Sequence, residues 1–193
     1  MAAATIVVEV THGPSGSNTW ASAEAPGSLV FNRQDAEGAG SPVIIPGPGN
    51  GLKSAYSNYK VLRLDVTVAG TTSISNIRLR KAATEAPGLR LFTGTTFPTS
   101  YTQCTGTGVA QGNRPADKAS ALVASPHPDT PANYQLVPVS PTTVAMDPGP
   151  YATTATGRFG NYFQLLLGVS DQYAGGPSSA AALPTVTVLY DEA

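Results

Sequence analysis

Apolar and polar residues alternate along several short stretches of this chain, with the period of two that is typical of β-strands with one buried face. The clearest alternation lies in residues 59–68, where leucine and valine occupy positions 62, 64, 66 and 68 and polar residues stand between them. The same period recurs in residues 6–10, 73–80, 89–93, 162–169 and 185–190, with shorter apolar stretches at 29–31 and 43–45. The pattern predicts a chain made of short strands.

The strands predicted over 59–68 and 73–80 are joined by the short link Ala69-Gly70-Thr71. A link this short predicts that the two strands form a β-hairpin or part of a meander. Ile74 is out of phase with Ile77, which predicts a β-bulge or a late start of the second strand.

Residues 162–169 are apolar on both faces, because Leu166 interrupts the polar side of the alternation. A strand of this kind is buried on both sides, so we expect it to be central in its sheet. The inward-facing residues of the predicted strands form one contiguous core, made of Leu62, Leu64, Val66, Phe163, Leu165, Leu167, Val186 and Val188.

The segment from about 94 to 150 is rich in Gly, Pro, Ser and Thr and has little periodicity, so we interpret it as a long irregular insertion. It contains the one helix candidate, residues 114–124, with Asn113 as the cap. Long structureless connections are usually functional or disordered. We therefore expect this segment to reach a neighbouring subunit, and residues 1–5 form a second candidate arm.

Together these features predict an all-β protein in which residues 1–193 form a single antiparallel β-sandwich domain. We expect seven or eight strands, long Pro/Gly-rich loops and at most one short helix. Immunoglobulin-like and jelly-roll topologies both fit the pattern. A chain of 193 residues buries a core large enough to fold without disulfides, and none can form within the chain because Cys104 is its only cysteine.

The composition favours a surface that other subunits cover. Charged residues make up 12% of the chain, against about 25% in typical proteins, and the net charge is −1. We expect protein partners and a homo-oligomer, but no nucleic acid, because the basic residues form no concentrated field. The chain has neither a signal-peptide pattern nor the roughly 18 consecutive apolar residues that span a membrane, so we expect intracellular assembly and no membrane contact.

The residues that most often carry chemistry form no known catalytic or metal-binding pattern. His12 and His127 lie in loop-like stretches without a second ligand at metal spacing, and no signature of a thiol nucleophile surrounds Cys104. Residues 47–54 resemble a phosphate-binding loop, but Leu52 stands where that loop needs glycine. We therefore expect no enzyme activity, no catalytic residues, and no cofactor or metal site.

Acidic and aromatic side chains leave weaker possibilities open. The acidic residues are dispersed: Asp35, Glu37, Asp129, Asp147, Asp171, Asp191 and Glu192. Asp35 and Glu37 lie in a Gly-rich loop and are interpreted as solvated charges, because the Asp-x-Asp-x-Asp-Gly pattern of a calcium loop is absent from the sequence. A spatial pair of carboxylates for glycoside hydrolysis stays open. The aromatic residues in or near loops suit a protein interface or a sugar-stacking platform: Trp20, Tyr56, Tyr59, Tyr101, Tyr134, Tyr151, Tyr162 and Tyr173.

Three stretches, residues 59–68, 73–79 and 186–192, resemble small β-rich structural proteins of the virions of tailed bacteriophages. The resemblance implies a capsid decoration (cement) protein, or a tail, neck or baseplate component. It implies an oligomer without cofactor that contacts the major capsid protein or other virion proteins, and a virion location after assembly in the host cytoplasm. From other classes of function, a carbohydrate-binding β-sandwich and a hydrolase remain as alternatives.

Overall fold

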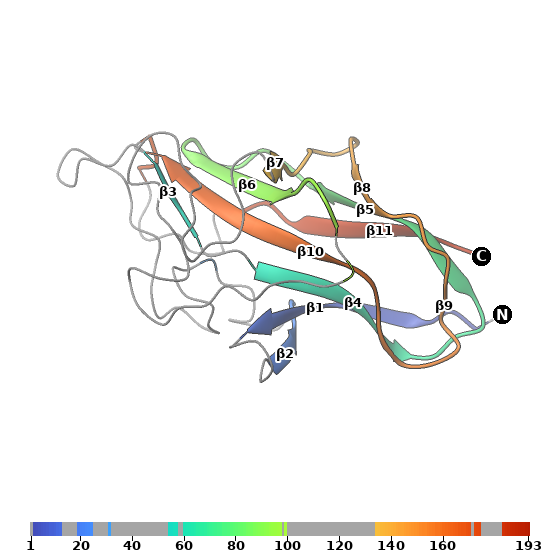
Figure 1. Ribbon diagram of the computed structural model, residues 1–193. Helices are drawn as coiled ribbons and strands as arrows, with labels where there is room; N and C mark the ends of the chain where they lie inside the picture. The colour runs from blue at the N-terminus through green and yellow to red at the C-terminus, as the bar shows by residue number, and fades with distance from the viewer. Residues whose placement is uncertain are drawn as a thin grey trace.

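A computed structural model describes residues 2–12, 19–24, 31, 54–57, 60–97, 99, 134–170, 172–174 and 183–193. These residues form two antiparallel β-sheets that pack together around an apolar core (Figure 1). The protein is therefore an all-β sandwich, as the alternation predicts. No helix occurs within the described ranges.

The larger sheet has seven strands, of which six follow the order β2-β1-β4-β10-β6-β7 and the seventh, β3, pairs with β10. Their bounds are β1 Thr5–His12, β2 Thr19–Ser22, β3 Ser54–Tyr56, β4 Lys60–Val68, β6 Leu89–Gly94, β7 Tyr134–Leu136 and β10 Gly157–Ser170. Strand β10 lies between β4 and β6, which confirms that the strand containing Leu166 is central.

The smaller sheet has four strands, β5 Ser73–Lys81, β8 Val144–Asp147, β9 Tyr151–Ala152 and β11 Val186–Glu192. Strand β5 pairs with β11 on one side and with β8 and β9 on the other. The described strands number eleven, more than the seven or eight predicted. Strands β2, β3, β7, β8 and β9 have only two to four residues each, which is too short for a visible period.

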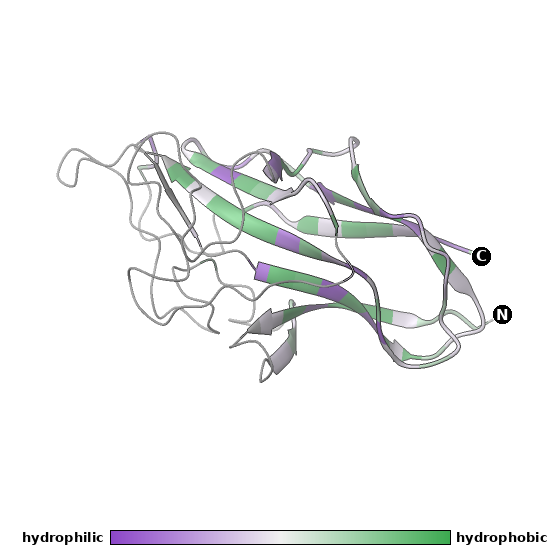
Figure 2. Ribbon diagram, in the orientation of Figure 1, coloured by the Kyte–Doolittle hydropathy of each residue, from purple (hydrophilic) through white to green (hydrophobic). Residues whose placement is uncertain are grey.

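The predicted core is largely confirmed. Its members on β4 and β10 are each at most 3% exposed: Leu62, Leu64, Val66, Phe163, Leu165 and Leu167. Val186 and Val188 on β11 are half-buried and pack against the main cluster, whereas Val66 is buried outside it. Figure 2 shows the resulting predominance of apolar residues along β4, β10 and β6.

The predicted hairpin of residues 59–68 and 73–80 is wrong, because β4 and β5 belong to different sheets. The link between them crosses from one sheet to the other and is held by distant backbone: Gly70 N–H donates to Thr153 O, and Thr71 N–H donates to Ala2 O. A Cβ on Gly70 would lie 2.6 Å from Ala4 N, so only glycine allows this approach. Both strands face one core from opposite sides, and alternation alone cannot distinguish this from a hairpin.

The predicted irregularity in β5 is confirmed as a bulge. Asn76 has a φ of 52°, in the left-handed region that Asn tolerates, near the point where the pairing of β5 with β11 shifts register. The extra residue lets both Ile74 and Ile77 face the core, with exposures of 0% and 2%.

The predicted insertion is too long at its C-terminal end. Residues 134–150 contribute β7 and β8, and Val137 in the connection between them is 1% exposed. These residues were missed because the prolines at 138, 141, 148 and 150 obscure short strands held by pairing with β6 and β5. The helix candidate at 114–124 lies outside the described residues.

The first and last residues that the structure describes, Ala2 and Ala193, form hydrogen bonds within their own subunit. Ala2 N–H donates to Thr71 Oγ1 at 3.0 Å, and Ala193 exchanges backbone hydrogen bonds with Ser73. Residues 2–5 of the predicted arm thus make contacts with their own subunit, and their contact with a neighbouring subunit stays a prediction.

Candidate functional site

The outer face of the larger sheet carries a group of aromatic and arginine side chains, here called the aromatic patch: Trp20, Tyr162, Arg63 and Arg158. Trp20 on β2 lies opposite Thr11, on the face away from the core residue Val10. Arg63 on β4 and Tyr162 on β10 alternate with the core residues of their own strands, so they also point outward.

The four side chains of the aromatic patch stack in a row. The ring centroids of Trp20 and Tyr162 are 6.2 Å apart and their planes are inclined by 32°. The guanidinium carbon of Arg158 lies 4.7 Å from the Trp20 ring centre, and that of Arg63 lies 4.6 Å from the Tyr162 ring centre. Each ring therefore holds a cation at the distance of a cation–π interaction.

A bulge in β10 positions Arg63. The pairing of β10 with β4 shifts register between Phe159 and Phe163, so three residues of β10 stand opposite one of β4. Arg63 Nε donates to the carbonyls of Phe159 and Gly160 at 3.2 and 3.0 Å, and its Nη1 donates to the Tyr162 hydroxyl at 3.1 Å. The arginine thereby satisfies the carbonyls that the bulge releases from the ladder.

Arg158 is held more loosely, because its side chain is 39% exposed. Its ion pair with Glu9 reaches across β4 to β1. Trp20, Tyr162 and Arg63 are half-buried. Trp, Tyr and Arg are the residues that most often dominate the energy of protein interfaces. The aromatic patch thus offers rigid rings and donors on an outer sheet face.

A second apolar cluster lies on the same outer face: Val61, Tyr134 and Leu166 are buried, with Phe92 and Tyr162 packed against them. The larger sheet is consequently apolar on both faces near its centre, which is the arrangement that Leu166 indicates in the sequence.

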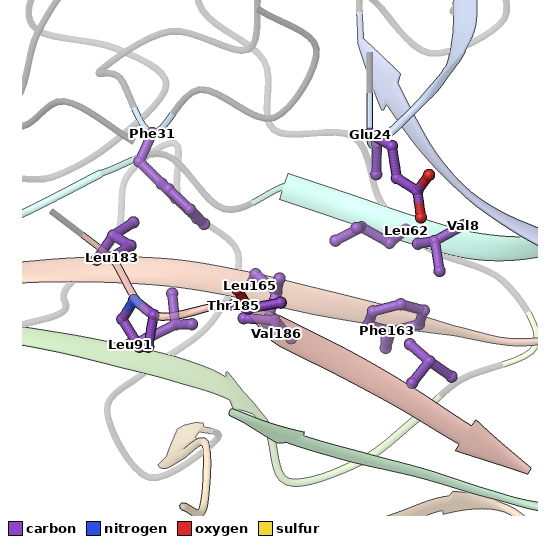
Figure 3. Close-up of a pocket in the computed structure, with 13 residues that line it drawn as sticks. Val8, Glu24, Phe31, Leu62, Leu91, Phe163, Leu165, Leu183, Thr185 and Val186 are labelled. Carbon is purple, nitrogen blue, oxygen red and sulfur yellow. The ribbon is translucent and has the colours of Figure 1, made fainter. Parts of the chain in front are cut away.

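A pocket of about 340 Å³ opens between the two sheets on the core side (Figure 3). It is lined by residues from both sheets, including Val8 on β1, Leu62 on β4, Phe163 on β10 and Val186 on β11. Glu24 is its one charged lining residue, among those the structure describes. The described lining of the pocket is therefore largely apolar, with a single carboxylate.

The structure places few of the chemical candidates named from the sequence. His12 is the last residue of β1 and pairs with Thr19, which corrects its assignment to a loop; its side chain lies outside the description. His127, Cys104, Asp35, Glu37, Asp129, Asp171 and residues 47–53 lie outside the described residues. Asp191 and Glu192 end β11 and accept hydrogen bonds from Asn76 and Thr72 respectively.

Asp147, one of the dispersed acidic residues, is 5% exposed at the end of β8. Its carboxylate accepts hydrogen bonds from Gly149 N–H, Tyr151 OH and Asn161 N–H at 2.9, 2.8 and 2.8 Å. Burial, the hydrogen bond to Asp147 and the charge of that carboxylate, in that order, raise the pKa of Tyr151 to about 12, while Arg63 has an opposing effect. Asp147 thus has a structural role.

A second buried carboxylate, Glu85, is also structural. Its Oε1 accepts hydrogen bonds from Lys81 Nζ and Leu91 N–H, both at 2.6 Å, and the Lys81 and Glu85 side chains are 4% and 1% exposed. The pair lies in the connection that carries the chain from β5 in the smaller sheet to β6 in the larger one.

Among the residues that the structure describes, no three His, Cys, Asp or Glu side chains gather closely enough to hold a metal ion. No helix long and apolar enough to cross a membrane occurs in the described ranges. Comparison with known families, with curated proteins and with solved structures finds no match to this chain.

Of the aromatic patch, Trp20 and Tyr162 were candidates from the sequence, whereas Arg63 and Arg158 were missed. The position of Arg63 on the polar face of the most regular strand could have indicated it. No sequence pattern indicates Arg158, because it follows a glycine and precedes the predicted start of its strand.

Proposed function

We propose that this chain is a non-catalytic structural subunit of a larger protein assembly, and that the assembly is the virion of a tailed bacteriophage, with the chain decorating the capsid. The aromatic patch is the observation that carries the proposal. Its Trp, Tyr and two Arg side chains lie together on an outer sheet face, and this composition is typical of the centre of a protein interface. The low charge of the chain and the resemblance of residues 59–68, 73–79 and 186–192 support the same function.

The patch suits a protein partner better than a flat ligand. A guanidinium already covers one face of each ring, and the two rings are inclined by 32°, so no flat two-ring platform is formed. The partly exposed Arg158 can pair with an acidic group of a partner if its contact with Glu9 is released. We expect the partner to be the major capsid protein, presenting a carboxylate next to an apolar surface.

The first experiment asks where the protein is found. Virus particles assembled from the genome that carries this gene are purified by density gradient, and the copy number of the protein is measured by quantitative mass spectrometry. We expect a fixed copy number relative to the major capsid protein. Absence of the protein from purified particles would overturn the proposal.

The second experiment tests the patch. Arg158→Ala is compared with the matched variant Arg90→Ala, which removes an exposed arginine from the same sheet outside the patch. We expect Arg158→Ala to weaken attachment to particles lacking the protein by about tenfold or more, which corresponds to about 1.4 kcal/mol of binding free energy. Arg90→Ala is expected to bind like the original protein. Equal binding by both variants would exclude the patch from the contact.

Carbohydrate binding is the second candidate function, and it rests on the pairing of Trp20 with Tyr162. Trp20 is the only tryptophan, so the tryptophan fluorescence of the protein, excited where tyrosine does not absorb, reports on the patch alone. Saturable fluorescence changes with an oligosaccharide, lost in Tyr162→Ala, would favour a sugar-binding module over an assembly subunit.

A further inference from the structure

Among the described strands, β11 forms an edge of the smaller sheet. It pairs with β5 on one side, and no other described strand pairs with its other side. Residues 186–190 contain neither proline nor charge, which are the usual devices that prevent a strand edge from pairing with another chain, and the two charges of the strand, Asp191 and Glu192, stand at its C-terminal end. The other described sheet edges are β2, β7, β8 and β9, and each is at most four residues long.

The pocket between the sheets lies along this same strand. Val186 and Val188 of β11 line it together with Val8, Leu62 and Phe163 of the larger sheet (Figure 3). The pocket exists because the smaller sheet is narrower than the larger one. Its last strand, β11, leaves the inner side of β1 partly uncovered, so that Val8 is only half-buried.

We propose that the free edge of β11 and the adjoining pocket form an acceptor groove for a single extended strand of a partner protein. The added strand extends the smaller sheet by pairing its backbone with β11 and places alternate apolar side chains in the pocket. Main-chain hydrogen bonds supply affinity in such strand addition, and pockets for alternate side chains supply specificity. This proposal goes beyond the proposed function and does not depend on the assembly being a virion.

The overhang of the larger sheet argues against a symmetric pairing of two copies through β11. Strands β1 and β2 lie beyond the free side of β11, away from β5 and β8 (Figure 1). Two antiparallel β11 strands related by a two-fold axis would place both larger sheets on the same face of the joined sheet. The margins formed by β1 and β2 of the two copies would then occupy the same space. A single extended segment carries no sheet behind it and fits.

The described ends of this chain do not supply the strand. Residues 2–5 pair with β4 and the link after it, and Ala193 pairs with Ser73. The chemistry of the groove specifies the partner segment instead. Its side chains toward the pocket are aliphatic, and a lysine or arginine near one end meets the exposed carboxylate of Glu24 at the pocket.

The experiment uses the full chain and a synthetic peptide of alternating valine and threonine with lysine at one end. Hydrogen exchange at the amides of residues 186–190 is measured with and without the peptide. We expect exchange at the amides on the free side of β11 to slow by about tenfold or more. A peptide with proline at alternate positions is expected to give no protection, because it cannot donate to the ladder.

Two matched variants test the pocket. Val188→Lys places a charge on the pocket side of β11, and Leu189→Lys places it on the opposite side. After thermal unfolding confirms that both are folded, Val188→Lys is expected to weaken peptide binding by about tenfold, and Leu189→Lys by less than about twofold. If Val188→Lys does not fold, Val186→Thr replaces it, with a weakening of several-fold expected.

Three results would overturn the proposal. The first is no protection of β11 by the peptide, and the second is equal weakening by the two lysine variants. The third is a concentration-dependent dimer in sedimentation that Val188→Lys abolishes, since this would identify a second copy as the occupant. None of these results bears on whether the protein is found in virus particles.

Discussion

The hydroxyl of Tyr151 donates a 2.8 Å hydrogen bond to Asp147 Oδ2, and the same oxygen accepts the backbone N–H of Asn161 at 2.8 Å. Tyr151 belongs to β9 of the smaller sheet and Asn161 to β10 of the larger one. One carboxylate oxygen therefore links the two sheets next to the bulge that positions Arg63.

We expect the stability of the protein to fall between about pH 10 and 12. The pKa of Tyr151 rises from 10.0 to about 12 on folding, because burial and the carboxylate of Asp147 disfavour the phenolate. A raised pKa means that the folded state retains the proton, so its contribution is complete below pH 10 and is lost as pH rises toward 12. Urea unfolding as a function of pH measures this. Tyr151→Phe should flatten this part of the curve, and an unchanged slope would contradict the assignment.

Asp147→Ala should lower the free energy of unfolding by about 2–4 kcal/mol, because buried donors that lose a charged acceptor cost roughly 1–3 kcal/mol each. The matched control is Asp191→Ala, whose carboxylate is 55% exposed and pairs with Arg78. The control should cost less than about 1 kcal/mol, as exposed ion pairs usually do. Equal losses in chemical denaturation would show that Asp147 is not a link between the sheets.

Removing one partner of the Lys81–Glu85 pair should be worse than removing both. Lys81→Met leaves the buried Glu85 carboxylate without its cation, with an expected loss of about 3–5 kcal/mol. The double variant with Glu85→Gln should recover part of that loss, because the neutral amide still accepts from Leu91 N–H. Thermal unfolding of the two single variants and the double variant gives the coupling energy, and additive losses would argue against a coupled pair.

Leu165→Ala should cost about 2–5 kcal/mol through the cavity that it leaves in the core. Leu165 is 1% exposed, on the central strand. Val68→Ala on the neighbouring strand is the control, because Val68 is 56% exposed and its truncation should change stability by less than about 0.5 kcal/mol. Denaturant midpoints compare the two, and a small effect at Leu165 would show that the core there can collapse.

Gly88→Ala should destabilise the protein far more than Gly157→Ala. Both glycines have positive φ, 85° and 136°, but a Cβ at Gly88 would lie 2.3 Å from Tyr173 N, whereas none of the surrounding atoms lies within 4 Å at Gly157. We expect about 2–4 kcal/mol at Gly88, from strain and overpacking together, and about 1 kcal/mol at Gly157, from strain alone. Similar melting temperatures for the two variants would contradict the close approach of Tyr173.

The strands of the sandwich follow from the sequence where they are long enough to show alternation. Leu62, Leu64 and Val66 are all on one face of β4 and all buried, because the period of two is a property of the extended backbone itself. The same argument places Leu166 on the other face of a central strand. Only five or more alternating residues make such a pattern visible, so β3 and β9 were missed.

The assignment of strands to sheets needed the tertiary structure. Both inner faces of a sandwich converge on one core, so Leu64 and Ile77 carry the same apolar signal although they lie in different sheets. The link at Gly70 is short enough for a hairpin, and what decides against one is its backbone pairing with Ala2 and Thr153, far away in the chain.

For the aromatic patch and the edge at β11, too, the sequence and the tertiary structure determined different features. The sequence determined which residue types were present: a single tryptophan, tyrosines near strand ends, and a strand that begins with Val-Thr-Val-Leu-Tyr. Only the tertiary structure brought Arg158 over Trp20 and Arg63 over Tyr162, because the sheet joins positions about 100 to 140 residues apart. It also decided that β11 is an edge beside a pocket, since the width of one sheet relative to another depends on the pairing of all strands at once.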